Sequence, residues 1–576
     1  MYERNYKLLS GKFKEFFIPT LLTSMTGNIC LLVDSIIVSN LIGAVALSAI
    51  QPVEPLSTFV NLIYWMIGLG GSVMCSVAKA EFDNEKSNRI FSVSIMSLVL
   101  IGVLFSLLGT LFSGPIIGIL CPSAQIQPIV FQYYSIYILE IPFLCFIMCL
   151  SYFVRADGIA DLPLRSLIVA NVANIIFDLI FIGVFGWGLS GAAGATIVGY
   201  ILGSLYMLTY FFNPKRTLNF VFVKVKTFLS TTAEICKSGF SGASTQLYFT
   251  IKIFIINTLI TLYIGQYGLV AFNICCNSLF ILYIFLIGTA QTMSPIVSVY
   301  YQEEDYKSVE YITKKSLKIV LASSLILSVF FIICPQSLLM LYQVNNPSDI
   351  PIVLNAIRIF SLSYVGIAIT FLYTFYAQAI QKDKLSNTIS ILEGCVFPVI
   401  FAFLLSFLMG ANGIWISFTI AEVLTILYIF IYSRYLNKKT DGEYSGFFIN
   451  KHNDDKKVFA YTIEGDVKQA VELSRQVNDY LAENKSAVLV SMAIEEMLVN
   501  IININESVDA IDVIVKNNDE NILISIKDTG IDFNPVVEND NLEFDNISVL
   551  NKIADKIDYS RVLGLNSTVI TINSRN

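Results

Sequence analysis

The sequence predicts an all-α polytopic membrane protein of twelve transmembrane helices in two parallel six-helix repeats, followed by a C-terminal cytoplasmic α/β sandwich. Three observations support this fold class. Of the 576 residues, 55% are hydrophobic and only 14% are charged, which excludes a disordered chain and an ordinary soluble enzyme. Up to residue 436, apolar stretches reach the about 20 residues that a bilayer-spanning helix needs. The sequence beyond that point is polar and strongly acidic.

Twelve apolar segments make up the membrane part. Residues 1–220 form the expected N-terminal six-helix lobe, and residues 221–436 form the C-terminal lobe. The expected spans are 15–40, 47–78, 90–113, 130–154, 164–186, 190–213, 237–264, 270–300, 314–340, 353–380, 386–408 and 413–436. No cleavable signal peptide is expected, because the first apolar run continues as a full spanning helix.

Lys and Arg residues gather in alternate loops. The loops around residues 41–46, 114–129, 187–189, 265–269, 341–352 and 409–412 contain none, whereas the loops on the other side are rich in them. The positive-inside rule then places both termini in the cytoplasm of a multi-pass inner-membrane protein. Twelve is the even number of spans that this topology requires.

The two halves repeat one another at a spacing of about 220 residues. Gly68-Leu69-Gly70 leads to the charged run 79–83, and Gly288-Thr289-Ala290 leads to the run 301–305. Gly191 opens the sixth span, and Gly413 opens the twelfth. Because both halves have the same topology, the repeat is parallel. Such halves pack around a central cleft that faces each side of the membrane alternately.

A linker, residues 437–457, leads to a soluble domain, residues 458–576. From residue 440 onward there are 12 Lys and Arg against 24 Asp and Glu, which argues against nucleic acid or an anionic bilayer surface as its partner. An α/β sandwich, rather than a doubly wound parallel sheet, follows from the order of elements. Strands are expected at 457–463, 511–516, 521–528, 557–562 and 567–573, and helices at 466–484, 485–504 and 546–556.

The sequence offers few residues for a metal site, a redox centre or a catalytic triad. All ten cysteines lie in the membrane part without a CxxC pair, and His452 is the only histidine. These counts argue against a zinc site, a thioredoxin-type centre and a Ser-His triad. The sequence also lacks the GxxxxGK[ST] loop of a cassette-type ATP pump.

Asp34 and Asp178 lie inside two of the expected spanning helices. A carboxylate within the bilayer is costly, so each residue is a functional-site candidate. Asn174 precedes Asp178 by four residues and therefore shares its helix face. The alternative is structural, with Asp34 capping a helix break or making a buried bond.

The residues around these carboxylates resemble a known family. Pro19, Leu32-Val33-Asp34 and Leu41-Ile42-Gly43 resemble the first helix of multidrug and toxic compound extrusion (MATE) transporters. The runs 155–158, 174–178 and 191–196 are similar to that family's fourth-to-sixth helix region. The resemblance covers about residues 10–436.

This resemblance implies a cation site in the N-terminal lobe, formed by Asp34, Asn174, Asp178 and Thr196. Carboxylates in a low-dielectric medium hold a proton more readily than in water. Alternatively, two carboxylates with an amide and a hydroxyl oxygen offer hard ligands to Na⁺. The expected coupling ion is therefore H⁺ or Na⁺, and its binding would change the helix packing and the affinity for cargo.

Further charged residues lie within the spans. Glu54, Glu140, Lys252 and Glu393 are candidates for holding a cationic cargo in the central cleft. A buried pair of Lys252 with Glu393 or Glu422 is the alternative. Arg155 and Arg165 lie beside Asp157 and Asp161, which predicts solvated or paired side chains within a loop.

The soluble domain resembles the GHKL ATPase fold, especially the small anti-sigma-factor serine kinases. The resemblance rests on Glu496-Met-Leu-Val-Asn500 and Asp528-Thr-Gly530. It implies ATP with Mg²⁺, the metal being coordinated by Asn500, with Glu496 orienting a water or an acceptor hydroxyl. Asp528 would accept a hydrogen bond from the adenine amino group, Gly530 would permit close backbone approach, and Thr568 would lie on the adenine side.

The phosphate lid departs from that pattern. A glycine-rich lid should precede the expected helix at 546–556, but the run Glu543–Leu550 contains no glycine. Glycine-rich lids cradle phosphates through backbone N–H groups, and bulky residues hinder this approach. The missing glycines argue against phosphotransfer, and they leave ATP binding itself open.

The leading prediction is a cation-coupled antiporter, not an enzyme, that exports small cationic or amphipathic compounds. Its regulatory tail would sense a nucleotide or a cytoplasmic regulatory protein. One alternative is a lipid-linked oligosaccharide flippase of the same superfamily, which a cleft rich in Arg and Lys would favour. The other is a membrane sensor with an anti-sigma or serine-kinase-like output domain, which an intact lid would favour.

Overall fold

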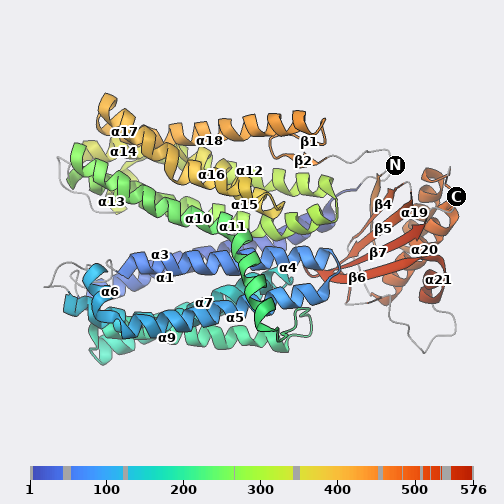
Figure 1. Cartoon of the computed structure of the whole chain (residues 1–576), viewed down its shortest axis with the longest axis horizontal. Coiled ribbons are helices and arrows are strands. Elements are labelled where there is room, and N and C mark those ends of the chain that lie inside the picture. The colour runs from blue at the N-terminus through green and yellow to red at the C-terminus, as the bar shows by residue number, and fades with distance from the viewer. Residues whose placement is uncertain are drawn as a thin grey trace.

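The structure is a computed structural model that describes most of the chain. Figure 1 shows a bundle of long helices with a smaller α/β domain at one end. Below, the end of the bundle that contacts this domain is the domain-side end. The described residues are 4–42, 53–120, 127–264, 266–341, 350–451, 458–482, 484–505, 510–518, 520–531, 534 and 546–573.

The N-terminal lobe contains six helices or broken helices. They are α1 (Lys7–Leu41), α3–η2–α4 (Glu54–Tyr64, Trp65–Leu69, Gly70–Ala80), α5 (Asn84–Leu111), α7 (Gln127–Ala156), α8–η3 (Asp161–Asp178, Leu179–Val184) and α9 (Gly188–Met207). A short helix, α6 (Ser113–Leu120), follows the third of these, and a 3-10 turn, η4 (Leu208–Phe212), extends the sixth.

The C-terminal lobe repeats this plan. Its six are α10 (Val225–Tyr263), α11 (Gln266–Gln302), α12 (Tyr306–Ile333), α14–α15 (Ile350–Ser361, Tyr364–Ala379), α16–η5–α17 (Asp383–Ile391, Leu392–Val396, Phe397–Met409) and α18 (Ala411–Lys439). The short helix α13 (Gln336–Leu341) follows the third one, as α6 does in the first lobe.

These helices account for every expected span. Eleven helices in the described ranges are long and apolar enough to cross a membrane, and the bent pair α14–α15, with a 44° bend, gives a twelfth. One of the eleven, α20 (Ala487–Ile504), belongs to the C-terminal domain, where its apolar residues pack against a sheet. The 35-residue helix α1 takes its place. Within the described residues, each of the twelve expected spans therefore lies on a helix or a broken helix.

Two matching turns at the domain-side end, one in each lobe, show the internal repeat. The Asp83 carboxylate accepts a hydrogen bond from Lys86 N (2.8 Å) and caps α5, and Asp305 caps α12 through Ser308 N (3.2 Å). The residues before them, Phe82 and Glu304, have φ values of 60° and 57°. The two turns therefore share their backbone path as well as their sequence position.

Close packing of α8 on α9 depends on two glycines. A Cβ added at Gly199 would lie 2.6 Å from the Ala170 carbonyl oxygen, and one at Gly203 would lie 2.8 Å from Ala170 Cβ. Only hydrogen at these positions lets the two backbones approach so closely. This contact places the end of α8, including Asn174, against α9.

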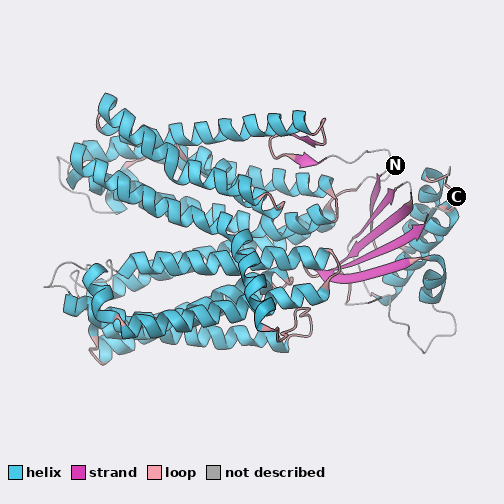
Figure 2. Ribbon diagram, in the orientation of Figure 1, coloured by secondary structure: helices cyan, strands magenta, loops and turns pink. Residues whose placement is uncertain are grey.

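The C-terminal domain is one antiparallel sheet with helices on one face (Figure 2). The strand order is β3-β4-β5-β7-β6. The sequence of strands and helices agrees with the expected one. The elements are β3 (Val458–Ile463), α19 (Val467–Tyr480), α20, β4 (Ile511–Asn517), β5 (Asn521–Asp528), α21 (Asn546–Ile553), β6 (Lys556–Val562) and β7 (Leu565–Asn573).

Alternating residues divide this sheet into two faces. Apolar residues such as Val513, Ile524 and Ile570 form a core with α19 and α20. Asp512 and Lys527, which pair across β4 and β5, point to the other face, because successive strand residues alternate. That second face lies against the domain-side end of the helix bundle.

The segment expected to be a linker also carries structure. Two short strands, β1 (Tyr444–Ser445) and β2 (Asn450–Lys451), pair after α18. Between them, Phe448 stacks on Tyr373 with ring centroids 5.1 Å apart, and Ile449 is fully buried. Aromatic residues within a polar segment therefore fix the chain to the C-terminal lobe, and His452 lies outside the described residues.

We expect Gly199→Val to lower the free energy of unfolding by about 1–3 kcal/mol, because the added carbons overpack the α8–α9 contact. Thermal unfolding in detergent measures the change. Gly118→Val on α6 is the control, since nothing lies within 4 Å of a Cβ at Gly118. Equal shifts in both variants would contradict this account of the packing.

Candidate functional site

Two carboxylates meet inside the N-terminal lobe. Asp34 lies on α1 and Asp178 is the last residue of α8, and their carboxyl groups are close enough to interact. Asp178 is fully buried. Among the described residues, neither of its oxygens has a hydrogen-bond partner of ordinary geometry. The π-helical turn η3 begins directly after Asp178, and such turns are frequent at functional sites.

Asn174 and Thr196 form the second pair of this region. The Asn174 side chain donates a hydrogen bond to Thr196 Oγ1 at 3.2 Å, joining α8 to α9. Asn171, one turn earlier, donates to the Thr26 carbonyl oxygen at 3.2 Å and joins α8 to α1. The four residues expected to form a cation site therefore lie on three helices that α8 holds together.

A third acid lies nearby. Glu140 on α7 is 5% exposed and interacts electrostatically with Asp34. It is therefore close to the carboxylate pair of the N-terminal lobe, whereas the cargo candidates Lys252 and Glu393 lie in the other lobe. The side chain of the remaining cargo candidate, Glu54, lies outside the described residues.

The C-terminal lobe buries a separate charged cluster. Lys252 on α10 interacts electrostatically with Glu393 in η5 and with Glu422 on α18. Thr370 donates a hydrogen bond to Glu422 Oε2 at 2.7 Å, while Glu393 Oε2 has no partner among the described residues. This geometry favours a buried charge cluster over exposed ligands for cargo, because all three side chains are at most 6% exposed.

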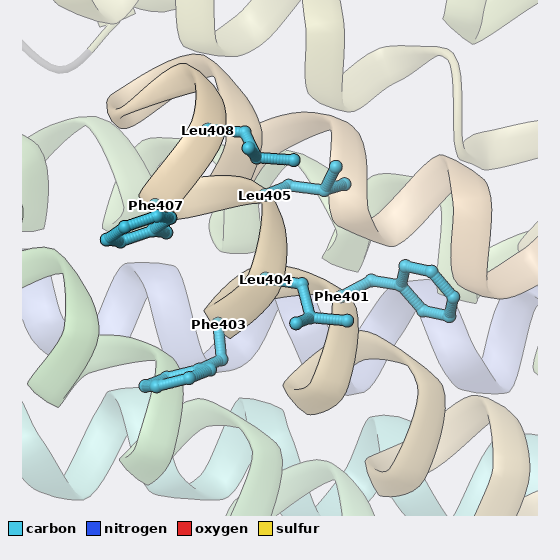
Figure 3. Close-up of a pocket in the computed structure, with 6 residues that line it drawn as sticks. All are labelled: Phe401, Phe403, Leu404, Leu405, Phe407 and Leu408. Atoms are coloured by element: carbon cyan, nitrogen blue, oxygen red, sulfur yellow. The ribbon is translucent and has the colours of Figure 1, made fainter.

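An apolar pocket of about 460 Å³ lies on α17 (Figure 3). Its lining consists only of Phe and Leu side chains, of which Phe407 is 81% exposed. A strongly exposed apolar face on a spanning helix is suited to contact lipid tails. The pocket has no charged group and none of the candidate residues, so it is not a coupling site. The lining residues are Phe401, Phe403, Leu404, Leu405, Phe407 and Leu408.

Buried polar bonds fix the domain-side end of the N-terminal lobe. Lys79 forms an ion pair with Asp157, and both side chains are at most 3% exposed. Tyr210 donates to Asp157 Oδ2 at 2.7 Å, and Thr217 N donates to the same oxygen at 2.9 Å. Asp157 is therefore the centre of a satisfied network rather than a solvated loop residue.

The expectation for Arg155 is wrong. Its side chain is 4% exposed, and Nη1 donates to Gln291 Oε1 of the other lobe at 2.7 Å. The end of α7 packs against α11, so the guanidinium cannot reach solvent. Arg165 does behave as expected, because it forms an exposed pair with Asp161 at 3.5 Å.

The residues of the expected nucleotide site share the helix-covered side of the C-terminal sheet. Asp528 ends β5 and is 3% exposed. Its Oδ1 accepts hydrogen bonds from Gly530 N (2.7 Å) and Asn566 Nδ2 (2.9 Å). Burial raises the pKa of this carboxyl, and the two hydrogen bonds offset part of the effect. Thr568 lies on the neighbouring strand β7, paired with Ile526.

Glu496 and Asn500 are half-buried on α20, four residues apart. Asn505, which follows the helix, ties it to the loop after β5 through a hydrogen bond from Ile531 N (2.8 Å). A Cβ at Gly530 would lie 2.5 Å from Asn505 Oδ1. Asn505 therefore positions the Gly530 loop beside α20, a role without a motif that sequence reasoning could find. The expected lid before residue 546 lies outside the described residues.

Comparisons with known proteins agree on the membrane part. The family model described as MatE matches residues 19–180 and 243–404, one match in each lobe. The chain is 24% identical over 434 residues to the multidrug export protein MepA of Staphylococcus haemolyticus, covering 74% of this chain and 93% of that protein. It is 26% identical over 211 residues to the probable multidrug resistance protein YoeA of Bacillus subtilis, covering 36% and 45%.

Solved structures show the same fold. A transporter of the MOP superfamily from Pyrococcus furiosus superposes with a TM-score of 0.69 at 18% identity, covering 75% of this chain and 96% of that one. An outward-facing multidrug resistance MATE transporter superposes with a TM-score of 0.68, also at 18% identity and with the same coverage. The matched residues of the family model include none of the C-terminal domain.

Asp157→Asn should lower the free energy of unfolding by about 3–5 kcal/mol, because it leaves the buried Lys79 ammonium without a counter-charge. Asp161→Asn, four residues away, removes an exposed pair and should change stability by less than about 1 kcal/mol. Thermal unfolding of the two variants measures the contrast. Similar losses in both would show that burial does not decide the contribution of these pairs.

Proposed function

The chain belongs to the MatE family of membrane transporters, and from this premise we propose that it is a cation-coupled antiporter exporting small cationic or amphipathic compounds. The observation that carries the proposal is the contact between Asp34 and Asp178 in an apolar lobe interior. Two carboxylates with no counter-charge among the described residues favour the uptake of a proton or a monovalent cation. The names of the MepA and YoeA relatives support multidrug export as the cargo class.

The helices that carry Asp34 and Asp178 explain how uptake of a cation would change the packing of the N-terminal lobe. Asp34 belongs to α1 and Asp178 to α8, so repulsion between the charged groups acts between the two helices. H⁺ or Na⁺ removes this repulsion and draws the helices together. Because Asn174 joins α8 to α9 and Asn171 joins α8 to α1, the change passes to three helices of the lobe. Differential packing in the two states is what couples the ion to the cargo.

The loops define the proposed orientation. The domain-side loops carry the Lys and Arg residues, so this end and the C-terminal domain lie in the cytoplasm. The opposite end faces the outside of the inner membrane. An inward cation gradient then drives export through the cleft between the lobes.

We also propose that the C-terminal domain binds a nucleotide with Mg²⁺. The chain's residues fit this group in two respects. Asp528 uses Oδ1 for its internal hydrogen bonds, while Oδ2 makes none to the described residues and stays available to an adenine amino group. The buried Asn500 Nδ2 has no partner among the described residues, so it can donate to a phosphate oxygen, while only Oδ1 of this amide could ligate Mg²⁺. ATP would supply phosphates that hold Mg²⁺ against Asn500, beside Glu496, with Thr568 and Gly530 next to the adenine.

Asp34→Asn is expected to abolish cation-driven efflux, because the amide cannot exchange a proton or supply a charged ligand. Efflux of a panel of cationic dyes from proteoliposomes, under imposed H⁺ or Na⁺ gradients, measures this loss. The gradient that drives export in the native chain identifies the coupling ion.

The matched control is Asp161→Asn, the same substitution at an exposed acid on α8. It should retain export close to that of the native chain. Export that persists in Asp34→Asn would remove the coupling role from the carboxylate pair. No export from the native chain under either gradient would favour the flippase or the sensor.

Asp528→Asn should weaken binding of Mg·ATP to the full-length chain by about tenfold or more, since a hydrogen bond to a charged group contributes about 1.5–3 kcal/mol. Binding should also weaken as the pH falls toward the raised pKa of Asp528, because protonation removes the acceptor charge. Equilibrium dialysis with labelled ATP measures both effects. Asp479→Asn on the exposed side of α19 is the control, and unchanged binding in Asp528→Asn would exclude this adenine site.

A further inference from the structure

The second face of the C-terminal sheet docks on the C-terminal lobe through buried charges. Arg4 lies between two carboxylates, 2.6 Å from Asp305 Oδ2 and 3.0 Å from Asp512 Oδ2. Asp305 caps α12, whereas Asp512 belongs to β4. Burial alone would raise the pKa of Asp305, but the Arg4 guanidinium holds it below its usual range. One arginine thus joins the start of the chain, the transporter and the sheet.

Strands β4 and β5 add two lysines to the same contact. Lys527 forms an ion pair with Glu303, and its ammonium lies 3.7 Å from the centroid of the Tyr300 ring. Lys516 donates to the Glu303 carbonyl oxygen at 2.6 Å. The Lys527 and Glu303 side chains are 4% and 12% exposed. Charges this deeply buried have been taken out of water, so losing one partner leaves a costly unpaired group.

The N-terminal lobe meets the same domain through packing and through an exposed ion pair, Lys7 of α1 with Glu464 at 3.6 Å. The turn between β6 and β7 presents Leu563 and Gly564 to Gly158, in the turn between α7 and α8. A Cβ added at Gly158 would lie 2.6 Å from Gly564 Cα, so the two backbones touch. Val562 and Leu563 are each 2% exposed and pack into the apolar core shared by both lobes. The domain therefore spans the seam between the lobes.

The lobes are joined to each other directly beneath this contact. Arg155 of α7 bonds to Gln291 of α11, and Gln302 Nε2 donates to Glu81 Oε1 across the same seam at 3.0 Å. Gln302 precedes Glu303, the partner of Lys527, by one residue. The docked sheet therefore covers a closed seam between the lobes. Its Lys527 pairs with Glu303, the residue next to the Gln302–Glu81 bridge.

We propose that the second face of the C-terminal sheet is a clamp that holds the domain-side gate of the transporter shut. This inference rests on the transporter function proposed above, because alternating access requires the lobes to part at this end. Parting the lobes must break the contact of the domain with one of them. The clamp therefore stabilises the state that is closed at the domain-side end and open at the other.

The unequal contacts determine how the clamp opens. A buried ion pair, Lys527 with Glu303, holds the domain to the C-terminal lobe. Backbone packing of Gly564 on Gly158 and an exposed ion pair on α1 join it to the N-terminal lobe. Separating the packing contact costs less free energy than separating the buried ion pair, because no buried charge is left without its partner. The domain therefore moves with the C-terminal lobe when the gate opens, and its β6–β7 turn leaves the N-terminal lobe.

Lys527→Glu in the full-length chain tests the clamp, because it places a second carboxylate against Glu303. Hydrogen–deuterium exchange in nanodiscs without any ion gradient reports on the ends of α4, α7 and α11. We expect exchange there to become at least about tenfold faster, as loss of one buried partner predicts for local opening. Exchange within α19 and α20 should stay as in the native chain, which shows that the domain remains folded.

Two further variants complete the design. Lys556→Glu makes the same charge change at an exposed lysine that pairs with Asp558 inside the domain, and it should leave the gate protected. Lys527→Glu combined with Glu303→Lys restores an opposite-charge pair and should return the exchange toward the native rate. Native protection of the gate in Lys527→Glu, or equal opening in Lys556→Glu, would overturn the proposal. Because no transport is measured, failure of the clamp and failure of antiport are separate results.

Discussion

Compensation of charge inside an apolar interior is the constraint on which this structure depends. Where the compensation is complete, the chain is fixed: Lys79 with Asp157, and Arg4 between Asp305 and Asp512, are buried networks that hold turns and domains in place. Where it is incomplete, the chain has a group that can accept a cation. Among the described residues, Asp34 and Asp178 meet with no positive side chain to balance them, and the proposed coupling role rests on this feature.

Much of this architecture follows from the sequence, because the length of an apolar run and the spacing of glycines are local properties. The twelve spans, the repeat near Asp83 and Asp305, and the order of strands and helices were all predictable in this way. The meeting of Asn174 with Thr196 followed from resemblance to a family. The burial of Arg155 was not predictable, since it depends on which helix of the other lobe packs against α7. Nor was the role of Asn505, whose partner Ile531 lies in a loop 26 residues away.

The C-terminal sheet shows why its docking escaped prediction while its fold did not. A strand with apolar residues at alternate positions indicates one buried face, and the residues between them are usually exposed to water. Asp512, Lys516 and Lys527 fit that solvated pattern. Only the three-dimensional arrangement shows that Arg4, Glu303 and Asp305 supply the opposite charges, from segments more than 200 residues away. This strand face of mixed charge is therefore the interface between the sheet and the helix bundle.

Adjacent residues on β5 have an evolutionary consequence. Lys527 and Asp528 are neighbours in sequence, yet they point to opposite faces of the sheet, one toward the transporter and the other toward the helices. Natural selection can therefore act on the two faces separately, one substitution at a time. A substitution on the helix-covered face can therefore leave every residue that contacts the membrane part unchanged. An insertion or deletion within β5 has a different effect. A shift of one residue exchanges the two faces, so the Lys527 contact with the transporter and the hydrogen bonds of Asp528 are lost together.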